Sequence, residues 1–102
     1  MNLAETLCEL GHPVAYYPSL ARLLGGVPEA LFLCQLIYWT GKGADKESWI
    51  FKTAAELTDE TGLSYREQRR ARRVLKTFGI LQEKFNRLLH RTYFWIDSGR
   101  LE

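Results

Sequence analysis

The sequence predicts one α+β domain that is mostly helical and carries a small antiparallel sheet. Three observations predict it: a length of 102 residues with 46% hydrophobic side chains, two helices with strong start signals joined by a short turn, and a final pair of β-like segments. A chain of this size is expected to bury one core. We therefore expect a single domain over residues 1–102, with a lead-in over 1–12, a core over 13–97 and a tail over 98–102.

The cysteines and the apolar runs indicate a soluble protein of a reducing compartment. Cys8 and Cys34 belong to no C-x-x-C pair and are too few for a disulfide scaffold, so no metal site is expected. Cys34 lies in an apolar run and is expected to be a small buried side chain. No signal-peptide pattern opens the chain, and the longest apolar run, Ala30 to Trp39, is about half of the ~20 residues that a membrane span needs. We expect a cytoplasmic protein without membrane contact.

The first forty residues predict three helices and one extended segment. Proline near a helix start and glycine after a helix end divide them into a short helix over 3–10, an extended stretch over 13–17, a brief helix over 20–24 and a longer helix from Pro28 to Trp39 or Thr40. The longer helix is apolar nearly all the way round. Such a helix lies at the centre of a core or is shared with a second subunit. We therefore expect a homodimer through helix 28–40.

Two capping boxes predict a pair of helices in the middle of the chain. In each box, a Thr or Ser and a Glu three residues later satisfy each other's free backbone N–H groups at the helix start. A short turn that contains glycine joins the two helices, which is the helix-turn-helix arrangement. The expected order is a short strand over 49–52, a helix from the Thr53–Glu56 box to about Glu60, the turn Thr61-Gly62-Leu63, and a helix over 64–78 that Gly79 closes.

Two β-like segments follow, over residues 80–85 and 91–97, with residues 86–89 between them. They are expected to form a β-hairpin whose tip is Asn86-Arg87. The second segment alternates with a period of two, and both of its faces are apolar. We expect Tyr93 and Trp95, which share one of these faces, to cover the N-terminal helices. A hairpin directly after a helix-turn-helix pair is expected to form the wing of a winged helix-turn-helix fold.

Basic residues are concentrated in one third of the chain. Residues 1–61 have a net charge of −4 and residues 92–102 a net charge of −1, whereas residues 62–91 contain nine basic and two acidic residues, a net charge of +7. A protein of low total charge with one strongly basic region is typical of proteins that bind a polyanion on one side.

The helix over 64–78 is expected to bury one face and to expose arginines on the other. At 100° per residue, its apolar stripe consists of Ala71, Val74, Leu75 and Phe78. We expect this stripe to pack against Leu33 and Ile37. The opposite face consists of Arg66, Arg69, Arg73 and Lys76, with Arg70 and Arg72 on its flanks. Glu67 is the one acidic residue in this segment, so the like charges are expected to find their partner outside the fold.

An arginine ridge on a helix fits the major groove of duplex DNA, where arginine makes two hydrogen bonds to guanine. In a helix-turn-helix pair, the N-terminal part of the second helix contacts bases. The DNA contacts expected on this helix are Ser64, Tyr65, Arg66, Arg69, Arg70, Arg73 and Lys76, the last of them to phosphate. The contacts expected on the wing are Lys84, Asn86, Arg87, His90 and Arg91. A plain surface hairpin that does not contact DNA is the open alternative for this segment.

Four runs of sequence resemble a known group of proteins. YYPSLARLLGG, LIYWTGKGA, WIFKTAAELTDETGLSYREQRRARRVLKTFGIL and RTYFWID resemble the winged-helix domains of phage, plasmid and mobile-element replication initiators and related regulators, over roughly residues 14–97. The resemblance implies binding of an origin or operator by the helix over 64–78. It also implies a role in replication initiation or transcription control, in a bacterial or phage-infected cell.

No catalytic constellation is visible in the sequence. His12 and His90 lie in different expected elements, and no nucleophile with an orienting group accompanies them. We expect no enzyme, no cofactor and no metal. Two other functions stay open: a protein–protein adaptor or inhibitor that offers the basic face to an acidic partner, and RNA binding through Tyr93 and Trp95.

Overall fold

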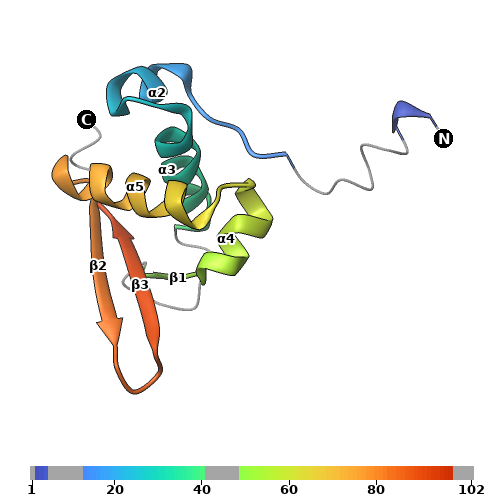
Figure 1. Ribbon diagram of the computed structural model, residues 1–102. Coiled ribbons are helices and arrows are strands. Elements are labelled where there is room, and N and C mark those ends of the chain that lie inside the picture. The colour runs from blue at the N-terminus through green and yellow to red at the C-terminus, as the bar shows by residue number, and fades with distance from the viewer. Residues whose placement is uncertain (1, 5–12, 41–48, 98–102) are drawn as a thin grey trace.

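The computed structural model describes residues 2–4, 13–40 and 49–97, which form an α+β fold that is mostly helical (Figure 1). The expected helix over 3–10 and the expected tail lie for the most part outside these residues. The strands form one antiparallel sheet in the order β1-β3-β2. The elements, labelled as in Figure 1, are α2 (Pro18–Leu24), α3 (Val27–Trp39), β1 (Ile50–Phe51), α4 (Ala54–Thr61), α5 (Tyr65–Thr77), β2 (Leu81–Asn86) and β3 (Arg91–Ile96).

Proline and glycine fix the corner between α2 and α3, as expected. Pro18 and Pro28 stand in the first turns of the two helices, where the missing N–H has no partner to lose. Gly25 ends α2 with a φ of 92°, a left-handed conformation that favours glycine. Among the described helices, none is by itself long and apolar enough to cross a bilayer, and α2 with α3 meets that length and composition only as a pair bent by 119°.

Both expected capping boxes are present. The hydroxyl of Thr53 accepts the N–H of Glu56 at 3.0 Å, and the Glu56 carboxylate accepts the N–H of Thr53 at 3.0 Å. Ser64 and Glu67 repeat this exchange at 3.2 and 2.9 Å. Gly62 ends α4 with a φ of 77° and donates its N–H to Thr58 at 2.8 Å. The chain therefore turns from α4 into α5 over residues 62–64, one residue later than the turn expected at 61–63.

Gln68 fixes the angle between α4 and α5. Its buried side-chain amide donates to the hydroxyl of Thr58 at 2.8 Å and to the carbonyls of Ala54 at 3.1 Å and Leu63 at 3.3 Å. These acceptors lie at the start of α4, in its middle and in the turn. One side chain of α5 therefore holds the whole of α4, a role that the sequence analysis did not assign to it.

The β2–β3 hairpin pairs over its full length, from Leu81 opposite Ile96 to Asn86 opposite Arg91. It extends away from the helices (Figure 1). β2 lies one residue later than expected, and β1 is shorter than the strand expected over 49–52.

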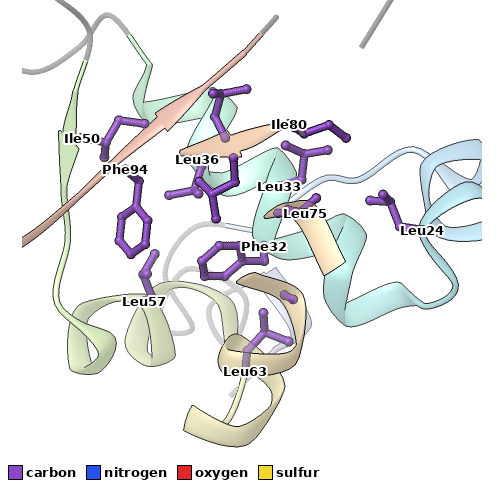
Figure 2. Packing of buried hydrophobic residues seen from close by; sticks show 13 residues of the cluster. Leu24, Phe32, Leu33, Leu36, Ile50, Leu57, Leu63, Leu75, Ile80 and Phe94 are labelled. Atoms are coloured by element: carbon purple, nitrogen blue, oxygen red, sulfur yellow. The ribbon is translucent and has the colours of Figure 1, made fainter. Parts of the chain in front are cut away.

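The core lies between α3, α5 and the inner face of the sheet (Figure 2). Phe32 and Leu33 of α3 are fully buried, and the ring of Phe32 meets that of Phe94 edge-on at 6.1 Å. Ala71 and Leu75 of α5 are also fully buried, as the apolar stripe predicts. α5 is therefore seated on α3 by a narrow stripe of side chains.

Several predicted burial positions are wrong. Phe78 is 45% exposed because α5 ends at Thr77, which places Phe78 after the stripe rather than in it. Val74 is partly buried at the edge of the core. Ile37 is exposed, because Leu36 rather than Ile37 completes the core-facing side of α3. Cys34 is half-buried, beside the segment over 13–17.

Candidate nucleic-acid interface

The exposed side of α5 carries three arginines without an acidic partner. Arg66, Arg69 and Arg73, which we call the exposed arginine cluster, lie on the side opposite Ala71 and Leu75 and are accessible to solvent. Among the residues that the structure describes, no carboxylate lies within ion-pair distance of any of the three. The cluster can therefore offer fifteen N–H donors to an external anion.

Ser64 and Tyr65 begin α5 and have different surroundings. The Ser64 hydroxyl accepts the N–H of Glu67, so it serves the helix start. Tyr65 is exposed, and the Arg69 guanidinium carbon lies 5.8 Å from the centre of its ring. The tyrosine is thus positioned to orient Arg69 of the exposed arginine cluster, because a cation is attracted to the face of an aromatic ring.

Arg70 has a partner inside the protein, contrary to expectation. Its Nε lies 3.2 Å from Oε1 of Glu29, a buried carboxylate in the first turn of α3. A side chain at Gly26 would collide with this carboxylate, so the glycine makes room for it. Arg70 itself stays largely exposed and still faces solvent beside the exposed arginine cluster.

Arg72 and Lys76 are also neutralised within the fold. Arg72 donates from Nε and Nη2 to the two carboxylate oxygens of Glu83 in β2, both at 2.8 Å, and Lys76 Nζ lies 3.6 Å from the same carboxylate. The hydrogen bonds from Arg72 hold the pKa of Glu83 below its usual value despite burial, and they raise the pKa of Arg72. Glu83 therefore fastens the C-terminal half of α5 to the sheet.

The six basic residues of α5 thus fall into two groups. Arg70, Arg72 and Lys76 have acidic partners, which corrects the expectation that the fold supplies none. The exposed arginine cluster has none among the described residues. The ion pairs of Arg70 and Arg72 lie on the flanks of the helix, and that of Lys76 lies at the C-terminal end of the arginine side, so the side from Arg66 to Arg73 stays free.

The predicted wing residues occupy three different settings on the hairpin. Lys84 lies 4.4 Å from the ring centre of Trp49, and the guanidinium of Arg91 lies 4.5 Å from that of Phe51. Asn86 shapes the turn, because its Oδ1 accepts the N–H groups of the residues two and three positions later at 3.0 and 3.1 Å. Arg87 and His90 are exposed in the turn itself.

Tyr93 and Trp95 do not cover the N-terminal helices, so this prediction is wrong. The ring centre of Trp95 lies 6.4 Å from that of Trp49, and the ring centre of Tyr93 lies 5.7 Å from that of Phe51. Both pairs lie on the outer face of the sheet. The alternate residue Phe94 meets the helices instead. The register explains the arrangement, because the pairing of β1 with β3 places these aromatic residues opposite each other on one face.

Glu60 is the centre of a second polar cluster that the sequence analysis missed. Its carboxylate accepts hydrogen bonds from Gln35 Nε2 at 2.6 Å, Trp39 Nε1 at 2.8 Å and Lys52 Nζ at 2.6 Å. Burial alone would raise the pKa of Glu60, but these hydrogen bonds together lower it. The cluster joins α3, α4 and the end of β1. The one signal in the sequence was Gln35, a polar residue within an apolar helix.

An open groove of about 1060 Å³ lies beside this cluster, between the segment over 13–17, the outer side of α3 and the end of α4. Within the described ranges, no three His, Cys, Asp or Glu side chains come together as metal ligands would. The groove lies between elements other than α5 and the hairpin, so it is separate from the basic surface.

Comparisons of this chain with protein-family models, with curated proteins and with solved structures give no match.

Proposed function

We propose that this protein binds double-stranded DNA in a sequence-specific manner, with α5 as the recognition helix of a winged helix-turn-helix fold. The observation that supports the proposal most directly is the exposed arginine cluster: three guanidinium groups on one side of a helix whose other basic residues have acidic partners. Arg66 and Arg69, in the first half of α5, would contact base edges, and Arg73 would follow along the groove.

The arrangement of charge argues against an ordinary solvated helix face. Such a face usually mixes signs, because opposite charges at i,i+3 and i,i+4 stabilise a helix. Arg66, Arg69 and Arg73 follow one another at spacings of three and four, so they repel in the free protein. A duplex would relieve this repulsion by placing phosphates and guanine acceptors around them.

The hairpin supports the same proposal as a wing. Lys84, Arg87 and Arg91 give it three positive charges, and the segment over 84–91 contains no acidic residue. Because phosphate contacts fix register without reading sequence, the wing would position α5 rather than select bases. The biological setting that we propose is replication initiation or transcription control.

Selection of binding sites from a random duplex library tests the proposal. We expect one enriched motif, and we expect Arg69→Ala to weaken binding to it. Arg22→Ala is the matched control, because Arg22 is an exposed arginine on α2, outside the proposed interface. If no motif is enriched and Arg69→Ala binds duplex as the wild type does, the proposal fails. A protein adaptor that offers the same basic face to an acidic partner would then be favoured.

We also propose that two copies associate through α3. Val27, Leu31, Cys34 and Tyr38 follow one another on α3 at spacings of four, three and four, the period of a helix–helix seam. Val27 and Tyr38 are exposed, Cys34 is half-buried, and Leu31 is partly buried against the core. A dimer would present two recognition helices to half-sites about one helical turn apart. Sedimentation equilibrium is expected to show a dimer that Tyr38→Lys converts to monomer. Wild-type protein that stays monomeric at tens of micromolar, with and without DNA, would contradict this.

A further inference from the structure

The tip of the β2–β3 hairpin exposes three large apolar side chains. Leu88 is 94% exposed, Phe85 59% and Leu89 52%. The hairpin carries them away from the helices (Figure 1). Single exposed apolar residues are ordinary on protein surfaces, but three together on a projecting tip indicate a contact surface.

Hydrogen bonds hold this tip in one conformation. Asn86 Oδ1 accepts the N–H groups of Leu88 and Leu89, and Asn86 pairs with Arg91 across the strands. His90 closes the turn with a φ of 51°, a left-handed conformation, and its ring lies 6.4 Å from that of Phe85. The backbone under the two leucines is therefore fixed before any partner arrives.

The charges around the tip restrict the kind of partner. Lys84, Arg87 and Arg91 lie within four residues of the leucines, and the segment over 84–96 contains no acidic residue. A partner that complements this surface has negative charge outside and apolar surface within reach. Duplex DNA has both, because its phosphates line the grooves and its base pairs stack between them.

The length of the hairpin suits a second groove. Six residues per strand at about 3.3 Å each extend roughly 20 Å. One turn of duplex is about 34 Å, so adjacent grooves are separated by about half of that. A wing of this length can reach the minor groove next to a major groove that α5 occupies.

We propose that Leu88 and Leu89 insert between stacked base pairs from the minor groove and kink the duplex, while Arg87 and Arg91 bind the flanking phosphates. This inference rests on the DNA binding proposed above and adds a mode of action to it. Apolar side chains inserted in this way unstack one base step and bend the duplex by roughly 20–90°. The pyrimidine–purine step TA is the expected site, because it unstacks most easily.

The test uses a duplex of about 40 base pairs with central TA steps, 2-aminopurine in place of one adenine at each step, and a dye at each end. At low salt we expect wild-type protein to bind, to raise the 2-aminopurine fluorescence about twofold or more, and to shorten the distance between the dyes. Leu88→Ser with Leu89→Ser, and Leu88→Ser alone, are expected to lose both signals while the Kd rises no more than about tenfold. Leu23→Ser, at an exposed leucine of α2, is the matched control and is expected to keep both.

The failures of the two proposals are distinguishable. Wild-type protein that binds the duplex without unstacking or bending it leaves DNA binding in place and overturns the insertion. Wild-type protein that does not bind this duplex at low salt overturns both. Vesicles that contain phosphatidylglycerol form the last arm: binding to them that requires Leu88 and Leu89, without a 2-aminopurine signal on DNA, overturns the insertion in favour of a membrane contact.

Discussion

The two basic regions of the molecule, α5 and the β2–β3 hairpin, hold their positive charge by different means. On α5, Glu29 and Glu83 lie against three of the six cations. On the hairpin, Lys84 and Arg91 lie over aromatic rings, and no carboxylate among the described residues forms an ion pair with either. A carboxylate cancels the charge of its partner, whereas a ring orients the cation and leaves its charge in place.

This difference shows how ion pairs within the fold decide which side of a basic segment presents positive charge to solvent. On α5, the ion pairs of the flanking Arg70 and Arg72 and of Lys76 confine the remaining positive charge to the exposed arginine cluster. On the hairpin the charge stays spread over both strands. A count of basic residues therefore overstates the charge that α5 can present and gives a fair value for the hairpin. If the protein binds duplex DNA as proposed, we expect α5 to select the base sequence. We expect the hairpin to add affinity that decreases as the salt concentration rises.

The largest expected effect comes from removing the support under α5. Leu75 is fully buried between α5 and α3, so Leu75→Ala should lower the free energy of unfolding by ~2–5 kcal/mol. Urea denaturation followed by circular dichroism measures it. Val74→Ala, at a partly buried neighbour, should cost less. A loss below about half a kcal/mol for Leu75→Ala would mean that α5 is not seated on this stripe.

Arg72 and Arg73 are adjacent on α5 and test the distinction between its paired and its exposed basic residues. Arg72→Ala leaves Glu83, a largely buried carboxylate, without its two hydrogen bonds and with only Lys76, at 3.6 Å, as an ion-pair partner, and should cost about 1–3 kcal/mol of stability. Arg73→Ala removes an exposed side chain and should change stability by less than about 0.5 kcal/mol. Duplex binding should show the reverse order under conditions where both variants are folded. Equal effects of the two substitutions in either assay would remove the distinction.

Specificity and affinity should separate between the two regions. Arg69→Ala should cost ~1–3 kcal/mol on the selected duplex and relax the choice of base at one position. Arg87→Ala should weaken selected and scrambled duplexes alike, and should reduce the slope of log K against log salt by about one unit. Titrations of both variants on both duplexes across a salt series measure this. Equal losses on both duplexes for Arg69→Ala would make α5 an electrostatic clamp.

The smallest expected effect concerns the acid stability of the α5–β2 connection. The pKa of Glu83 is lowered in the folded protein, chiefly by its hydrogen bonds from Arg72, from the 4.5 that serves as its reference. A group with a depressed folded pKa stabilises the protein above the unfolded pKa, and this contribution is lost as the pH falls through the folded value. The free energy of unfolding of the wild type should therefore decrease as the pH is lowered below about 4.5. In Glu83→Gln this decrease should be smaller by about 1 kcal/mol or less. Denaturation of both proteins across a pH series measures this effect. Curves of unfolding free energy against pH that run parallel for the wild type and Glu83→Gln would contradict the prediction.

Local signals predicted the helices and the turn well. Each capping box needs two residues three positions apart, and Gly25 and Gly62 each relieve strain at one position. Such features are complete within a few residues, so the sequence contains all the information. The helical wheel places Phe78 in the buried stripe, which is wrong because a wheel does not show where the helix ends and Phe78 follows the last residue of α5.

The partners of the basic residues lie outside any local window. Glu29 is far from Arg70 in sequence, and Glu83 reaches Arg72 only because β2 folds back beside α5. Tyr93 and Trp95 were placed on the wrong side for the same reason. Alternation shows that they share a face, but the pairing of β3 with β1 decides which face packs on the helices.

The buried amide of Gln68 has a consequence for the thermodynamics of association. Because this amide contacts the start of α4, its middle and the turn at once, the orientation of α5 relative to α4 is fixed in the free protein. A partly mobile helix would surrender orientational freedom on docking, and that entropy would be subtracted from the affinity. In this protein the helix is already ordered when the chain has folded. We therefore expect association with a ligand to lose less configurational entropy than association by a helix that becomes ordered only on binding.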